Sequence, residues 1–181
     1  MLKIFTKSEL NSFVDRLILK KKSMKTEIVE CSIQHQTIKA IKYEHLVDLS
    51  LFDLNTRREI VKKYIKKLFK ESSITTVDGI QIKMSERSAS KVSRLTYNKQ
   101  QEITLYSGDL LQIASYLQTK PSHKEKVGSF RYYESYIFID EILYKAELNI
   151  FMDANGNRLY DINKISQLDA RSYEGYGSTE M

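Results

Sequence analysis

An alternation of apolar and polar residues dominates the last third of the chain. Apolar residues occupy every even position of 142–152 with Lys145, Glu147 and Asn149 between them, and four aromatic residues of 130–139 also fall on even positions. Alternation of this kind is typical of strands that are buried on one face. Asp140–Glu141 separates the two segments, and Asn155–Gly156, a pair that favours tight hairpins, precedes a third strand at 157–162. The pattern predicts an antiparallel meander of three strands.

Helical spacing of apolar residues is the main signal in the first seventy residues. Thr6–Glu9 has the spacing of a helix-capping box, and apolar residues at helical intervals follow it. A second helix is predicted over 56–70, where Thr56–Glu59 has the same capping spacing. Residues 26–43 lie between the helices and are rich in β-branched side chains, so they predict one or two strands.

The middle of the chain predicts short elements. GIQIK at 79–83 indicates a strand, and 85–95 can form a short helix with small apolar residues on one side. A further helix is expected from Ser107 through Leu117, followed by a loop at 118–126. The predicted fold class is therefore α+β, with an N-terminal helical and basic segment and a curved antiparallel sheet packed against helices.

These elements divide the chain into three parts. Residues 1–72 form a basic helix-strand-helix segment, and residues 79–168 form an α+β domain that contains the meander. Residues 170–181 are small and polar, and we expect them to be a flexible tail. An apolar fraction of 41% is enough for a packed core and excludes an intrinsically disordered chain.

The positive charge is concentrated in the first part. Residues 1–70 carry 16 Lys and Arg against 8 Asp and Glu, a net charge of +8, whereas residues 71–181 carry 13 against 15. A basic region beside a nearly neutral one indicates a polyanionic partner, for which RNA or a nucleic-acid-bearing protein is the usual candidate. The alternative is a solvated face, since lysine is also a solubilising residue.

The predicted helix 56–70 holds most of this charge. Seven cations in fourteen residues, with one acid among them, repel one another on an isolated helix. An RNA backbone or an acidic protein surface would relieve that repulsion, and a membrane surface is the competing explanation. The candidate RNA-binding residues are Arg57, Arg58, Lys62, Lys63, Lys66 and Lys67.

Several classes of protein are excluded by what the sequence lacks. No apolar run reaches the roughly 18 residues of a membrane span, and the N-terminus has no signal-peptide core, so we expect a cytoplasmic protein without a membrane partner. Cys31 is the single cysteine, which excludes an internal disulfide and a cysteine-rich metal site. Phosphate-loop, zinc-protease and serine-hydrolase motifs are absent. DANGN at 153–157 is better explained by a hairpin than by a calcium loop. No metal or cofactor is expected.

Residues 79–166 combine a short strand, short helices and a meander that reads YYESYIFIDEILYKAELNIFMDANGNRLYDI. An aromatic strand, an Asp-containing turn, an alternating strand, an Asn-Gly hairpin and a Tyr-Asp ending follow one another. In this order the segment resembles the phage-associated branch of the barnase–EndoU–colicin–RelE ribonuclease superfamily. The resemblance implies a ribonuclease-like fold and metal-independent RNA cleavage, in which a 2′-hydroxyl attacks the adjacent phosphate.

One departure from that family concerns the proton carriers. Some members end the motif with Tyr-Asp-His, but this chain has Tyr160-Asp161-Ile162, so the imidazole is absent. His123 lies in the loop before the meander, where it can reach the open face of the sheet. His35 and His45 flank a predicted strand and are more simply ordinary surface or core histidines.

RelE-type relatives use Lys, Arg and Tyr in place of His, which draws attention to the two long strands. We expect Arg131, Tyr133 and Lys145 to converge with Glu147 on the face opposite the apolar side. The alternative is a solvated face with a cross-strand ion pair.

Two residues of the short helix after the first strand match positions where family members place polar active-site residues. These are Ser88 and Lys91, although Ser85 and Ser88 can equally be helix caps. The candidate catalytic residues are therefore Arg131, Tyr133, Lys145, Ser88, Lys91 and His123.

The leading hypothesis is a phage ribonuclease-fold effector that acts on RNA in the host cytoplasm. Most phage relatives of this domain are embedded in very large polyvalent proteins, so a free-standing copy with a basic segment resembles anti-CRISPR proteins that trim the guide RNA of Cas9. The alternative is an inactive ribonuclease fold that blocks Cas9 or another protein by direct binding. A DNA-binding regulator is a weaker interpretation, because no helix-turn-helix pattern is visible.

Overall fold

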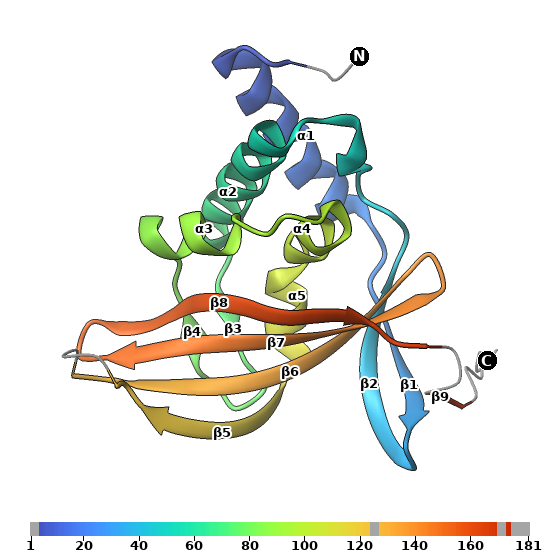
Figure 1. Cartoon of the computed structure of the whole chain (residues 1–181), viewed down its shortest axis with the longest axis vertical. Coiled ribbons are helices and arrows are strands. Elements are labelled where there is room, and N and C mark those ends of the chain that lie inside the picture. Colours follow the sequence, from blue (N-terminus) through green and yellow to red (C-terminus); the bar gives the residue numbers. More distant parts are fainter. Residues whose placement is uncertain (1–3, 124–126, 170–172, 175–181) are drawn as a thin grey trace.

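The fold consists of a twisted sheet with helices packed on one side of it (Figure 1). The computed structural model describes residues 4–123, 127–169 and 173–174. The helices are α1 (Lys7–Ser23), α2 (Leu54–Glu71), α3 (Glu86–Val92), α4 (Asn98–Thr104) and α5 (Ser107–Ile113), with a 3₁₀ turn η1 (Leu49–Leu51). The main sheet contains β1 (Glu27–Ile33), β2 (Gln36–Tyr43), β5 (Ser115–Pro121), β6 (Ser129–Ile139), β7 (Ile142–Asp153), β8 (Gly156–Gln167) and β9 (Tyr173–Glu174). A small separate sheet pairs β3 (Ile74–Thr75) with β4 (Gln81–Ile82).

Strand β6 organises the main sheet because two strands share one of its edges. Its residues 129–134 pair antiparallel with β5, and its residues 136–139 pair in parallel with β2. The other edge pairs with β7, which pairs in turn with β8. The strand order is β8-β7-β6-β2-β1-β9, with β5 beside the first half of β6. The predicted α+β class and the meander are confirmed, whereas the sheet is mixed and not entirely antiparallel.

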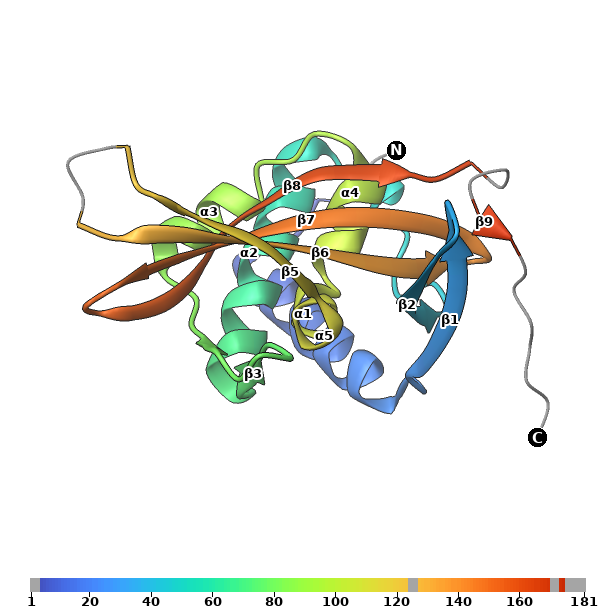
Figure 2. The same ribbon diagram turned by 90° about the horizontal axis from the view of Figure 1, so that it is seen from below.

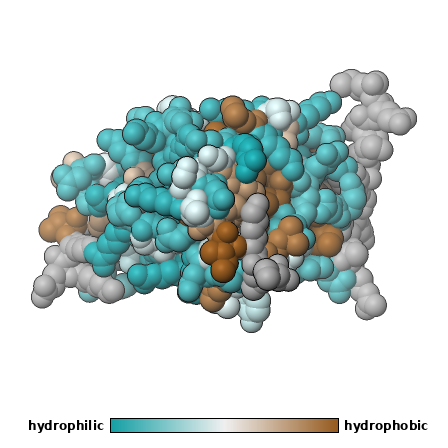
Figure 3. Space-filling view, turned by 90° about the horizontal axis from the view of Figure 1, so that it is seen from above, coloured by the Kyte–Doolittle hydropathy of each residue, from teal (hydrophilic) through white to brown (hydrophobic). Residues whose placement is uncertain are grey.

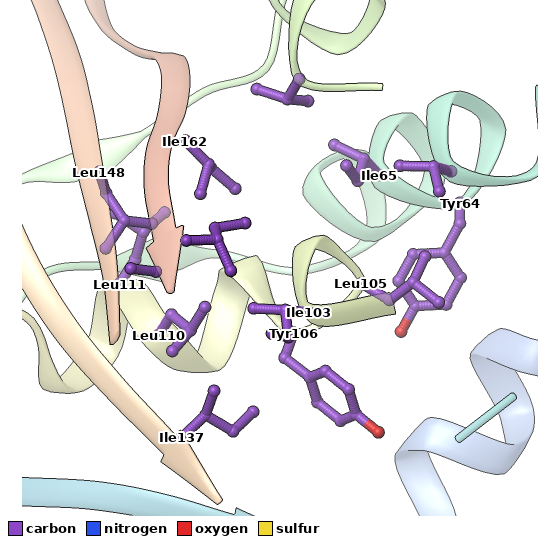
Figure 4. Packing of buried hydrophobic residues seen from close by; sticks show 14 of the residues in the cluster. Tyr64, Ile65, Ile103, Leu105, Tyr106, Leu110, Leu111, Ile137, Leu148 and Ile162 are labelled. Atoms are coloured by element: carbon purple, nitrogen blue, oxygen red, sulfur yellow. The ribbon is translucent and has the colours of Figure 1, made fainter. Parts of the chain in front are cut away.

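The face of the sheet that meets the helices forms the main core. Leu148 of β7 and Ile162 of β8 lie opposite Leu110 of α5, with Ile65 of α2 beyond them (Figure 4). All four side chains are at most 1% exposed. Because this core extends from Val14 on α1 to residue 165 on β8, it draws on both the 1–72 segment and the 79–168 segment.

A smaller apolar cluster covers one end of the opposite face, which we call the outer face. Cys31 of β1 and Ala40 of β2 pack there against Tyr136, Phe138 and Leu143. Cys31 is 3% exposed, so its predicted place in the core is confirmed. At this end the outer face is filled by the chain itself, and the other end is left open.

The helix predicted from Ser107 through Leu117 is wrong in its second half. Helix α5 ends at Ile113, and the next residues form β5, where the predicted loop 118–126 also begins. The apolar residues Tyr116 and Leu117 suggested a continuing helix, but both side chains are exposed. Backbone pairing with β6 decides the conformation here, since the observed strand does not bury these side chains. Helix α4 was not predicted at all.

Helix starts follow the stronger cap. The capping box of Thr6 and Glu9 is confirmed, since each side chain accepts a hydrogen bond from the other residue's backbone N–H. The box predicted at Thr56–Glu59 is wrong, because Asp53 caps α2 three residues earlier and accepts from both the backbone and the hydroxyl of Thr56. A carboxylate at the N-cap also complements the helix dipole.

The ends of the meander agree with the turn chemistry. The predicted hairpin joins β7 to β8, and Gly156 has the positive φ of +111° that this residue tolerates without strain. The tail predicted at 170–181 lies outside the described residues except for Tyr173–Glu174, which pair with β1. Within the described ranges, no helix is both long and apolar enough to cross a membrane.

The core predicts a clear difference between two leucines. Leu148→Ala should lower the free energy of unfolding by about 2–5 kcal/mol, because Leu148 is fully buried between sheet and helices. Leu117→Ala is the matched control, since Leu117 is 43% exposed on β5 and should change stability by less than about 1 kcal/mol. Urea unfolding followed by circular dichroism measures both. Equal losses would contradict the assignment of the buried face.

Candidate functional site

The open end of the outer face lies where the strands project beyond most of the helices, around the β7–β8 hairpin and the adjoining ends of β5 and β6 (Figures 1 and 2). A cavity of about 230 Å³ lies there, and we call it the aromatic pocket. Four strands and helix α3 contribute to its lining. The lining residues are Arg87, Lys120, Pro121, Ser122, His123, Phe130, Tyr132, Phe151 and Tyr160.

The rings of the aromatic pocket pack on one another. The Phe130 centroid lies 5.0 Å from that of Phe151 and 5.0 Å from that of Tyr160. Both pairs are inclined, at 52° and 69°, which suits the quadrupoles of aromatic rings. Strand alternation explains the gathering, since Phe130 and Phe151 are cross-strand partners in the register of β6 and β7. The result is an apolar floor made of flat surfaces.

Cationic side chains border this floor. Arg87 is exposed on α3, and Lys120 extends from β5 with its Nζ 5.6 Å from the ring centroid of Tyr132. His123 follows β5 and is also exposed. Among the described residues that line the pocket, none is acidic. Flat apolar rings beside cations fit a ligand that is both planar and anionic, as a nucleotide is.

The predicted residue Lys91 lies beside this pocket and contacts one of its rings. Its Nζ is 3.5 Å from the ring centroid of Tyr160 and 3.3 Å from Oδ2 of Asp161. The Asp161 side chain is 18% exposed, so the ion pair is partly shielded from water. Lys91 therefore holds the edge of β8 against α3 and places a carboxylate near the open face.

One buried polar side chain on the outer face has an unsatisfied atom. Asn149 of β7 lies between Tyr132 of β6 and Asp161 of β8 in the strand register. The residue is 6% exposed, and its Oδ1 has no hydrogen-bond partner among the described residues. Buried acceptors normally have a partner, so this atom marks a position where a ligand or water can donate.

Lys145 lies on the outer face but is engaged with its neighbours. Its Nζ forms an ion pair of 2.8 Å with Glu134 and lies 5.8 Å from the ring centroid of Tyr136. The hydrogen bond to Glu134 raises the pKa of Lys145 above its ordinary value. Glu147 is paired with Lys164 in the same way, at 3.3 Å. This end of the face matches the cross-strand ion pair that we considered as the alternative.

The predicted convergence of Arg131 and Tyr133 with Lys145 is wrong, because the two groups lie on opposite faces. The turn at Asp140–Glu141 has two residues, and this length sets a register in which odd positions of β6 lie opposite even positions of β7. Tyr133 is therefore opposite Leu148, and its side chain faces the helices. This register follows from the turn, and the sequence could have given it. The alternation within β6 alone does not show which residues of β7 lie on the same face of the sheet.

Arg131 and Tyr133 instead hold the loop between β3 and β4. Asp78 in that loop accepts from the Tyr133 hydroxyl at 3.0 Å, from Thr76 Oγ1 at 2.6 Å and from Arg131 Nη2 at 2.9 Å. Burial, reinforced by the hydrogen bond to Asp78, raises the pKa of Tyr133 to about 12, so the phenol remains protonated. The contacts fasten the loop to the sheet, and they give these two residues a structural part.

Ser88 belongs to a helix cap. Ser85 is the N-cap of α3, and its Oγ accepts from the Ser88 backbone N–H at 3.1 Å and donates to the Ser88 hydroxyl at 2.8 Å. Ser88 itself is 6% exposed. The capping interpretation is confirmed, and the structure does not bring Ser88 to the aromatic pocket, although α3 carries it close to Arg87 and Lys91.

The six candidate RNA-binding cations of α2 have partners within the chain. Acids from the neighbouring helices lie against them, so the repulsion expected for an isolated helix is relieved without an external polyanion. Lys62 and Lys66 both bind Glu86, and these hydrogen bonds lower the pKa of Glu86 to about 2. Lys67 pairs with Asp15, Lys63 donates to Asn11, Arg57 donates to Gln101 and Arg58 donates to the Arg94 carbonyl. Seen from the helix side, the surface is largely hydrophilic (Figure 3). A role of these residues in RNA binding stays a prediction.

His45 takes part in a buried network of its own. Oε2 of Glu102 lies 2.9 Å from His45 Nε2 and 2.9 Å from Lys99 Nζ, while Oε1 accepts from the Leu49 backbone at 2.8 Å. These contacts join α4 to the segment after β2 and support a structural role for His45. Described residues form no group of three or more His, Cys, Asp or Glu side chains able to hold a metal ion.

The aromatic pocket was missed by the sequence interpretation except for His123. Its rings were recognised as one face of the meander, but Arg87 and Lys120 attracted no attention. No local signal marks them, because they reach the pocket only through the pairing of β5 with β6 and the docking of α3 beside β8.

Asp78 predicts a pH-dependent contribution to stability. Partial burial alone would raise the pKa of Asp78, but the hydrogen bonds from Thr76 and Tyr133 and the charge of Arg131 outweigh it and lower the pKa below its ordinary value. The ionised group therefore stabilises the fold above its unfolded pKa of about 3.9, and this contribution disappears as the pH falls through the lower folded-state pKa. Asp78→Asn should cost about 1–3 kcal/mol at pH 7.

Urea unfolding of both proteins at pH 7 and near pH 2 checks this expectation, because the difference between them should vanish at the lower pH. Glu141→Gln is the control, since its ion pair with Lys42 is exposed and should contribute little. If Asp78→Asn lowers the free energy of unfolding by the same amount at both pH values, the ionised Asp78 carboxylate is not the source of the stabilisation.

Comparison with known proteins adds one match. No curated protein and no solved structure matches the chain. The family model of large polyvalent protein-associated domain 3 matches residues 53–160, which include α2, the aromatic rings of β6 and β7, and the first part of β8. This range covers most of the segment on which the ribonuclease resemblance rests, and it begins earlier, at the N-cap of α2. The chain therefore belongs to the family of large polyvalent protein-associated domain 3, a domain found in large polyvalent proteins of mobile elements.

Proposed function

We propose that the chain binds RNA on the open end of its outer face and cleaves it there without a metal. The observation that carries this proposal is the aromatic pocket, where flat rings lie beside Arg87, Lys120 and His123 with no acid in the described lining. Cations next to aromatic rings are the usual means by which proteins hold single-stranded nucleic acid. The ribonuclease resemblance of residues 79–166 supports the same function.

The reaction that we assign to this face is an internal transesterification, in which the 2′-oxygen of a ribose replaces the 5′-oxygen of the next nucleotide on phosphorus. The 2′-oxygen attacks phosphorus and loses its proton to a base, the bond from phosphorus to the 5′-oxygen breaks, and the leaving oxygen takes a proton from an acid. The products are a 2′,3′-cyclic phosphate and a free 5′-hydroxyl. Two proton carriers and a cation for the phosphorane are needed.

Three groups that line the pocket and one beside it fit these roles. His123 is the imidazole that can take or give a proton, and Arg87 and Lys120 are the cations beside it. We assign the second proton transfer to Asp161, which Lys91 holds at the edge of the same face. Lys145, Arg131 and Tyr133 are not assigned, because the first is paired with Glu134 and the other two face the helices.

Cas9 guide RNA is the first substrate that we propose to test. Membership of a polyvalent-protein domain family of mobile elements is consistent with an effector directed at a host nucleoprotein. The competing proposal is a protein that binds Cas9 or another nucleoprotein and blocks it without cutting RNA. The missing Tyr-Asp-His imidazole favours it, so the assay must separate the two.

Cleavage is expected in the presence of a chelator. End-labelled single-stranded RNA and guide RNA, each alone and with Cas9, should give shortened products that end in 2′,3′-cyclic phosphate. His123→Ala should lower the rate by about 10²–10⁴, the usual contribution of a general acid or base. His35→Asn is the matched control, because His35 lies in the β1–β2 turn at a positive φ that Asn tolerates. Intact RNA in every reaction would refute cleavage, and intact RNA with inactive Cas9 would establish the blocking alternative.

The pocket cations should determine how binding responds to salt. Arg87→Glu and Lys120→Glu should each weaken RNA binding and reduce the slope of log K against log salt by about 0.7 for each phosphate that the variant no longer neutralises. Fluorescence anisotropy over a salt series measures this. Lys63→Glu on α2 is the comparison, since Lys63 already donates to Asn11. A larger effect at Lys63 than at Arg87 would move the RNA-binding surface to α2.

A further inference from the structure

The aromatic pocket has the size of a single ring system. Its volume of about 230 Å³ lies below the roughly 300–1,000 Å³ that drug-sized ligands occupy. Phe130, Phe151 and Tyr160 contact one another at its floor, so a ligand stacks on these rings and does not enter between them. A flat group that fills this space would cover apolar carbon on one side.

The polar groups of the pocket are all at its border. Lys120 Nζ lies 5.6 Å from the ring centroid of Tyr132, and Arg87 and His123 are exposed. Two cations outside the lining also lie over rings of the pocket, Lys91 over Tyr160 and Arg158 over Phe151, so positive charge adjoins the rings on several sides. Ser122 adds a hydroxyl that can donate or accept at the edge of a planar ligand. A lipid chain or an aliphatic peptide side chain would use the rings but leave the cations without a counterpart.

We propose that this pocket is a subsite for one unpaired nucleobase, with the attached phosphate at Arg87 and Lys120. The inference rests on the proposed function for the statement that the base belongs to RNA, but it concerns recognition and does not depend on cleavage. A base in a duplex is stacked on both faces and paired along one edge, so it cannot lie on these rings. The subsite therefore selects single-stranded segments, loops and ends.

Nucleoside 5′-monophosphates test this inference, with ribose 5-phosphate as the matched ligand that lacks a base. Binding is followed through the ring signals of isotopically labelled tyrosine and phenylalanine. Mononucleotides should bind at least about 5-fold more tightly than ribose 5-phosphate, because stacking of one base on aromatic rings is worth this much or more. The ring chemical shifts of Tyr132 and Tyr160 should change as the nucleotide is added.

Tyr132→Leu should weaken nucleotide binding by about 5-fold to 100-fold and leave ribose 5-phosphate binding unchanged. Tyr97→Leu is the control, since Tyr97 is 70% exposed at the start of α4 and does not line the pocket. Circular dichroism of both variants shows whether they are folded. If Tyr132→Leu is unfolded, the comparison of nucleotide with ribose 5-phosphate on the unmodified protein still tests the base subsite. Lys120→Glu then tests the phosphate position at an exposed side chain, and it should weaken the binding of both ligands alike.

The outcomes separate this inference from the proposed function. Equal affinity for nucleotides and ribose 5-phosphate, or no saturable change at millimolar nucleotide, overturns the base subsite even if RNA is cleaved. Selective nucleotide binding with no cleavage of any RNA supports the subsite and refutes the catalytic proposal. Tight binding of duplex RNA without any unpaired base would also overturn the inference.

Discussion

The structure depends on the burial of one face of the sheet against the helices. Leu148, Ile137 and Ile162 are almost completely excluded from water on that face, where α5 and α2 cover them. Burial of side chains of this size contributes roughly 1.5–3 kcal/mol each, which makes the sidedness of the strands the strongest constraint on the fold. Since strand residues alternate between faces, the immediate neighbours of these core residues along β6 and β7 must lie on the outer face.

The outer face is then divided by the pairing of β6. The second half of β6 pairs with β2, and Cys31 of β1 packs in the apolar cluster that fills the outer face at that end. The first half of β6 pairs with β5, whose side chains are exposed throughout. At this end Phe130, Tyr132 and Tyr160 are half-buried, while Phe151 is 6% exposed. Helix α3 docks beside β8 and adds Arg87. The aromatic pocket exists because four consecutive strands, β5 to β8, and helix α3 meet at this end of the sheet.

The sequence predicted the parts of this fold that depend on neighbouring residues. Alternation over 142–152 and the turn chemistry around Gly156 locate the meander, and Thr6 with Glu9 locates the start of α1. The helix expected to run through Leu117 was wrong, because pairing with β6 overrides the apolar pattern there. Propensity is a weak guide wherever a distant partner is available.

The candidate site was harder to predict, partly because of register and partly because of distant partners. Arg131 was expected on the outer face, but the register set by the turn before β7 places it against Asp78. The lysines of α2 suggested an external polyanion, although Asp15 and Glu86 lie opposite them in the fold. Of the predicted catalytic residues, His123 lines the aromatic pocket and Lys91 contacts its Tyr160 ring. Contacts between charges that are far apart in the sequence leave no periodic signal.

The most direct test of the central claim is a titration of the isotopically labelled protein with a short single-stranded RNA, followed by nuclear magnetic resonance at every assigned backbone and ring position. We expect the signals of Phe130, Tyr132 and Tyr160 to move together with those at the exposed end of α3, while the exposed side of α2 stays unchanged. Shifts confined to α2, or to the end of the sheet near Cys31, would contradict the assignment of the open outer face as the place where the chain meets RNA.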